Sequence, residues 1–93
     1  MRGLHLADLE WVTRVLLAVP EVARGELLEQ ILVATACGSR HYLRTGRAHP
    51  AHGVGTLMSA ASRLPMVPRP ATLGPEYLRC LAMIALRIGD QPS

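Results

Sequence analysis

The stretch that decides the fold is residues 20–46, which read PEVARGELLEQILVATACGSRHYLRTG. Its opening proline suits the first turn of a helix, and its closing glycine suits a left-handed cap after the last turn. The stretch also carries a stripe at helical spacing, formed by Leu28, Ile31, Thr35, Gly38 and Tyr42. The small residues Ala34 and Gly38 would let a neighbouring helix approach closely. We therefore expect residues 21–45 to form the long central helix, with a kink or short break at Gly25.

The sequence on either side predicts three further helices, over residues 8–19, 57–63 and 75–88. Asp8 and Thr56 are placed to act as N-caps, because their side-chain oxygens can accept hydrogen bonds from free first-turn amides. Alanine and leucine, both strong helix formers, dominate all these segments. The sequence therefore predicts an all-α fold, a compact array of three main helices plus one short helix.

Two connections in this array are predicted to be non-helical. Residues 46–56 are rich in glycine and proline, and we expect this loop to fold onto the helices. In that arrangement, Arg47 and His49 would donate hydrogen bonds to backbone carbonyls. Residues 65–70 contain three prolines, which force an extended chain before the last helix.

The length and composition limit what the chain can be. With 93 residues, 49% of them hydrophobic and 18% charged, residues 1–93 make a single small domain and not a multidomain enzyme or a disordered chain. No stretch approaches 18 apolar residues, and no signal peptide is visible. We therefore expect a cytoplasmic protein without membrane contact, in which the two cysteines are reduced thiols.

The charges are unevenly distributed along the chain. The net charge is +3, and all ten basic residues are arginine, a bias that we attribute mainly to a GC-rich genome. Residues 31–70 contain five arginines and no acid. A basic segment over residues 40–69 could contact a nucleic acid or a phosphate, although no helix-turn-helix spacing is present. The candidate contacts are Arg40, Arg44, Arg47 and Arg63.

One group of residues resembles a set of metal ligands. Cys37 and His41 are one helical turn apart, and His49 and His52 lie in the loop that follows. Zinc takes cysteine and histidine ligands in a tetrahedron, but this spacing matches no familiar zinc signature. Cysteine also packs frequently as a small buried hydrophobe. From the sequence we therefore assign no metal ligand and no cofactor.

No residues of the chain form a recognisable catalytic arrangement. The region that holds the histidines contains no carboxylate to orient them, as a general base would need. The segment Gly53–Thr56 lacks the lysine and the preceding strand of a phosphate-binding loop. We therefore expect no catalytic residues and no enzyme activity.

Three large apolar residues fall on helix sectors that are otherwise polar, namely Leu17, Met83 and Leu86. Apolar side chains in such positions are typical of a helix-mediated contact. The sequence therefore favours a non-enzymatic protein–protein interaction domain whose partner is another protein or a second copy, as in a homodimer. Nucleic-acid or phosphate binding through the basic segment is the alternative.

Four segments of the chain also carry a resemblance. They are VLLAVP at residues 15–20, TGRAHP at 45–50, GTLM at 55–58 and PEY at 75–77. Together they resemble a family of short, uncharacterised bacterial helical proteins that share TGR-x-HP and G-x-G-[ST]-LM motifs. The resemblance implies a complete small protein and not a fragment. It carries no activity, cofactor, partner or functional residue.

Overall fold

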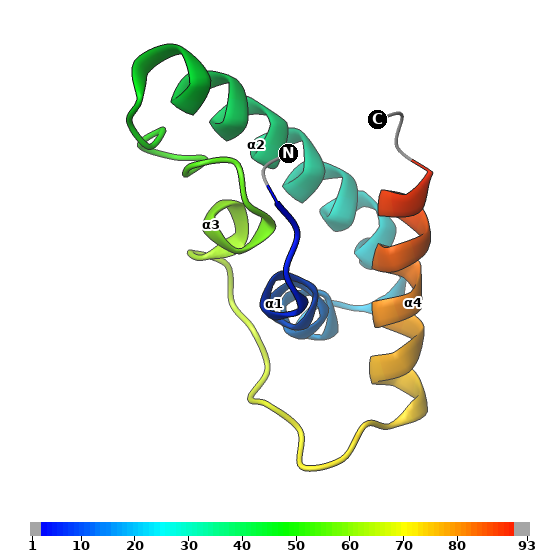
Figure 1. The fold of residues 1–93 in the computed structure, drawn as a ribbon. Coiled ribbons are helices and arrows are strands. Elements are labelled where there is room, and N and C mark those ends of the chain that lie inside the picture. The colour runs from blue at the N-terminus through cyan, green and yellow to red at the C-terminus, as the bar shows by residue number, and fades with distance from the viewer. Residues whose placement is uncertain (1–2, 91–93) are drawn as a thin grey trace.

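The computed structural model describes residues 3–90, which form four helices (Figure 1). These are α1 (Leu6–Leu17), α2 (Glu21–Thr45), α3 (Leu57–Ala61) and α4 (Pro75–Gly89). Residues 3–90 contain no strand, apart from one isolated bridge between His49 and Gly53. The predicted all-α fold is confirmed, and α2 has the expected bounds. It is unbroken at Gly25, so the alternative of a short break there was wrong.

The core lies around α1, which packs against all three other helices and is seen almost end-on in Figure 1. The stripe predicted on α2 supplies Leu28 and Ile31, and α1, α3 and α4 supply most of the rest. Leu16, Leu57 and Ile84 are fully buried at its centre. The remaining members of the cluster are Val12, Val15, Leu28, Ile31, Leu32, Ala61 and Cys80. An aliphatic core of this kind explains why the chain folds with so few aromatic residues.

The start of α1 differs from the prediction. The helix begins at Leu6 with His5 as its N-cap, so Asp8 lies in the first turn and is not the cap. Its buried carboxylate accepts a hydrogen bond from the His5 amide at 2.9 Å and one from the Met58 amide at 3.0 Å. The assignment of Asp8 as N-cap was wrong because its carboxylate serves two helices, closing the first turn of α1 and holding the start of α3.

Arg24 joins the ends of three helices from within the protein. The residue is 8% exposed, and its Nε donates to the carbonyl oxygens of Leu16 and Val19 at 3.0 and 3.2 Å. These carbonyls lie at or just beyond the end of α1, where no following helical turn supplies an amide; the Leu16 carbonyl also accepts from the Val19 amide at 3.2 Å. The Arg24 guanidinium also pairs with Glu76, in the first turn of α4, at 2.6 Å. This hydrogen bond raises the pKa of Arg24, against the opposing effect of burial.

The proline-rich connection between α3 and α4 is extended, as predicted. It lies along α1, where the Val67 amide donates to the Arg14 carbonyl at 3.1 Å and Arg14 Nε donates to the Val67 carbonyl at 2.8 Å. Among the described residues, no helix is long and apolar enough to cross a membrane.

Candidate functional site

The loop of residues 46–56 is folded tightly against the helices, as expected. It leaves α2 through Gly46, whose φ of 73° is the predicted left-handed cap. Two backbone hydrogen bonds then close a turn between His49 and Gly53, at 2.8 and 3.1 Å. Gly53 and Gly55 have φ angles of 74° and 98°, in a region of backbone conformation that residues other than glycine rarely adopt. The two glycines therefore set the path of the loop.

Gly38 is the point at which this loop contacts α2. A Cβ atom built on Gly38 would lie 2.5 Å from the carbonyl oxygen of His52 and 2.9 Å from that of Gly53. The prediction that Gly38 lets a neighbouring helix approach was wrong: the close approach occurs, but the partner is the backbone of the loop. Only glycine leaves room for this contact.

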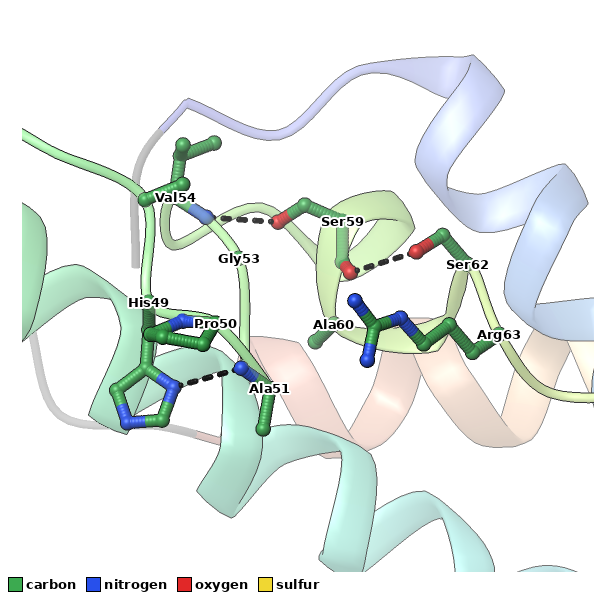
Figure 2. Close-up of a pocket in the computed structure, with 10 residues that line it drawn as sticks. His49, Pro50, Ala51, Gly53, Val54, Ser59, Ala60, Ser62 and Arg63 are labelled. Carbon is green, nitrogen blue, oxygen red and sulfur yellow. Dashed lines mark hydrogen bonds between the residues drawn. The ribbon is translucent and has the colours of Figure 1, made fainter.

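The other side of the loop is held by α3 (Figure 2). Ser59 Oγ accepts hydrogen bonds from the amides of Val54 and Thr56, at 3.2 and 3.3 Å. In return, Thr56 Oγ1 accepts from the Ser59 amide at 3.1 Å, so Thr56 is the N-cap of α3 as predicted. The loop is thus fixed between two helices.

This fixed loop brings together three of the four residues that resembled metal ligands. One ligand atom from each of Cys37, His49 and His52 lies within 4.8 Å of the other two, and all three side chains are half-buried. The rings of His49 and His52 stack with a centroid separation of 4.5 Å. His41 meets His49 edge-on at 5.0 Å, beside this group. We call Cys37, His49 and His52 the Cys/His cluster.

His49 bonds to the backbone in the opposite sense to the prediction. Its Nδ1 accepts hydrogen bonds from the amides of Ala51 and His52, at 3.0 and 3.1 Å, and does not donate to a carbonyl. Burial lowers the pKa of His49, and the nearby rings of His52 and His41 lower it further because neighbouring positive charges repel. A neutral ring suits the acceptor role of Nδ1.

The structure separates the arginines of the basic segment into two kinds. Arg69 forms an ion pair with Glu10 of α1, so its charge is neutralised by an acid from outside residues 31–70. The four candidate contacts are exposed and form no ion pair within residues 3–90: Arg40, Arg44, Arg47 and Arg63. Arg40 borders a groove of about 480 Å³ on α2 that Cys37 and His52 also line. Arg63 extends over a smaller cavity of about 210 Å³ beside the loop (Figure 2).

The three apolar residues predicted to contact a protein partner do not share one environment. Leu17 and Met83 are half-buried and pack against the core, whereas Leu86 on α4 is 71% exposed. Leu86 belongs to a second apolar face of α4, opposite the core, which we call the outer face. It consists of Leu78, Ala82, Ala85 and Leu86, all of which are exposed. Helical spacing alone could have revealed this face, since residues 78, 82 and 86 follow at steps of four.

A family model, described as a domain of unknown function (DUF7742), matches residues 2–88. The chain belongs to this family. No curated protein and no solved structure matches it. The match agrees with the resemblance to proteins of unknown function over most of the chain. Because the DUF7742 description names no activity, the function of the chain is argued below from its own residues.

Proposed function

We propose that this DUF7742 chain is a non-enzymatic interaction domain that forms a homodimer through the outer face of α4. The observation that carries the proposal is that α4 is apolar on two opposite sides while only one of them is covered. Tyr77, Cys80 and Ile84 are buried against the rest of the protein. On the opposite side, Leu78 is 47% and Leu86 is 71% exposed. A helix that is apolar on both sides is typically buried on both sides.

Nothing else in the described part of the chain covers this face. In Figure 1, α4 lies at the edge of the molecule, with α1 and the start of α2 on its inner side. Arg79 borders the outer face, because it lies one helical turn before Ala82 and two turns before Leu86, whereas Glu76 and Arg87 lie toward α2 and pair with Arg24 and Glu29. Burying an exposed leucine side chain stabilises an association by roughly 1.5–3 kcal/mol before the costs of ordering.

The pattern of the outer face fits a second copy of the same helix. Leu78 and Leu86 lie four residues on either side of Ala82. If two α4 helices cross antiparallel at Ala82, Leu78 of one copy faces Leu86 of the other, and the contact repeats by two-fold symmetry. The small side chains of Ala82 and Ala85 let the two helix backbones approach. A self-complementary pattern of this kind supports a homodimer over an unrelated partner.

The test is the mass in solution of the wild-type protein and of a double variant, L78E/L86E. Multi-angle light scattering at micromolar concentration should give a dimer for the wild type and a monomer for the variant, because two charges would have to be buried at the contact. Leu43→Glu is the matched control, since Leu43 on α2 is 80% exposed and lies outside the outer face. It should remain dimeric. A strictly monomeric wild type would contradict the proposal, as would an L78E/L86E variant that stays dimeric.

A second candidate function is the binding of a nucleic acid or a phosphate. It is supported by the four exposed arginines that have no acidic partner within residues 3–90. In a gel-shift assay at two salt concentrations, R40A/R44A should weaken binding at low salt and reduce its salt dependence. Arg79→Ala, which removes an exposed arginine from α4, should leave binding unchanged. If the wild type does not bind even at low salt, this candidate is excluded.

We also propose that the motifs TGR-x-HP and G-x-G-[ST]-LM are shared by bacterial members of the family. The second motif has a structural reason, because it contains the glycines at positive φ, the Thr56 cap and the buried Leu57. A cytoplasmic location is proposed with it, supported by Cys37 and Cys80 being free thiols. An alignment of the family would test the motifs, and fractionation of the source cells would test the location.

A further inference from the structure

We propose that Cys37, His49 and His52 bind a zinc ion where the loop of residues 46–56 meets α2. The ligand atoms of these residues lie within 4.8 Å of one another. In a tetrahedral zinc site, bonds of about 2.0–2.3 Å place neighbouring ligand atoms roughly 3.3–3.7 Å apart. Small side-chain rotations are therefore enough to bring the three atoms onto one ion. This site is separate from the outer face of α4 and does not depend on the dimer.

The backbone that carries the three ligands is already fixed in place. Cys37 lies within α2, next to Gly38, where the His52 carbonyl would lie 2.5 Å from an added Cβ atom. His49 and His52 stand within a turn closed by the two hydrogen bonds between residues 49 and 53. A rigid helix and a closed turn lower the entropy cost of gathering ligands. The loop thus has the properties of a ligand-bearing turn, in addition to its packing role.

The ligand types and the surroundings favour zinc. A thiolate with two imidazoles suits zinc better than magnesium or calcium, which prefer carboxylate and carbonyl oxygens. Binding would release the thiol proton of Cys37 to solvent. Cys37 and His52 line the groove of about 480 Å³ on α2, which gives an ion a path from solvent. Three protein ligands leave a fourth position for a water molecule.

Zinc binding must change the hydrogen bonding of His49. A neutral imidazole has one lone pair, and that of His49 Nδ1 already accepts the amides of Ala51 and His52. To give a lone pair to zinc, His49 has to release these two amides. Zinc and the two backbone amides therefore compete for the lone pair of His49. The Ala51 and His52 amides lose their hydrogen-bond acceptor when zinc binds, so their signals report on binding.

The first experiment is a titration of metal-free protein with Co²⁺, a spectroscopic substitute for zinc, followed by competition with Zn²⁺. The wild type should develop the thiolate-to-cobalt charge-transfer band and lose it when zinc is added. Cys37→Ala should abolish the band. Cys80→Ala should keep it, because Cys80 is buried in the core on α4 and takes no part in the cluster. His52→Ala should weaken Co²⁺ binding about 100-fold or more.

Two further variants separate ligation from loop structure. In His49→Asn, the side-chain oxygen still accepts the amides of Ala51 and His52, but no imidazole remains, so binding should fall as in His52→Ala while the turn is retained. His41→Ala removes the neighbouring ring without removing a proposed ligand and should keep the wild-type affinity within a few-fold. Circular dichroism should show that both variants remain helical.

The second readout is the ¹⁵N–¹H spectrum of the wild type with and without Zn²⁺. The amide signals of Ala51 and His52 should shift by the largest amount and exchange faster with solvent. The proposal is overturned if the wild type gives no thiolate charge-transfer band, if His49→Asn and His52→Ala bind as tightly as the wild type, or if His41→Ala abolishes binding.

Discussion

The two interior glycines of α2 stand in opposite surroundings. A Cβ atom at Gly25 would meet nothing within 4 Å, whereas one at Gly38 would lie 2.5 Å from a carbonyl oxygen of the loop. The N-terminal half of the helix is held by side chains, namely the buried Leu28 and Ile31 and the guanidinium of Arg24. The C-terminal half lies against the loop backbone. One long helix is therefore anchored in two ways, by buried side chains in its N-terminal half and by close backbone packing in its C-terminal half.

The largest expected effect is on the N-terminal anchor. Arg24→Ala leaves the carbonyls of Leu16 and Val19 without this donor and removes the partner of Glu76. We expect a loss of about 3 kcal/mol in the free energy of unfolding, measured by urea denaturation, because the lost hydrogen bonds are to a charged, buried donor. Arg79→Ala, an exposed control on α4, should cost less than about 0.5 kcal/mol. Equal losses in the two variants would mean that Arg24 is no anchor.

The next effect is on the C-terminal anchor. Gly38→Ala improves helix propensity but pushes the Cβ atom into the carbonyl oxygens of the loop. We expect a net loss of about 2 kcal/mol and increased hydrogen exchange in residues 47–55, because the loop must move away from α2. A stabilised variant with unchanged exchange would show that the loop does not rest on Gly38.

The same substitution at Gly25 should have the opposite sign. Because Gly25 lies in open space within a regular helix, Gly25→Ala should stabilise the protein by about 0.5–1 kcal/mol. Thermal unfolding of this variant beside Gly38→Ala tests the contrast directly. If both variants lose stability, α2 is under some constraint at Gly25 that its open surroundings do not reveal.

The smallest effect concerns the dependence of stability on pH. Burial raises the pKa of the Cys80 thiol, although the nearby positive charge of Arg24 opposes this. As the pH rises past the ordinary pKa of a thiol, Cys80 ionises in the unfolded chain before it ionises in the folded protein. The unfolded state is thereby stabilised, and the free energy of unfolding falls. The wild type should therefore lose more stability between pH 7 and pH 10 than Cys80→Ala does. Parallel curves for the wild type and Cys80→Ala would contradict the prediction.

The helices were predictable because their signals are local. Each signal acts over only three or four residues. The structure places Pro20 and Gly46 at the two ends of α2 and Thr56 at the N-cap of α3, as the sequence predicted. The start of α1 was misplaced because the carboxylate of Asp8 bonds to Met58, 50 residues away in sequence. The structural role of Arg24 was not predicted for the same reason, since it depends on contacts with Leu16 and Glu76 in two other helices.

The sequence by itself determined that the chain is helical, where three of its helices begin, and that four arginines stand free of acidic neighbours in sequence. Only the tertiary structure decided which residues meet. Cys37, His49 and His52 had no recognisable spacing, and their proximity depends on the absence of a side chain at Gly38. Periodicity is a property of one helix, whereas a contact between a helix and a loop depends on the shape of both.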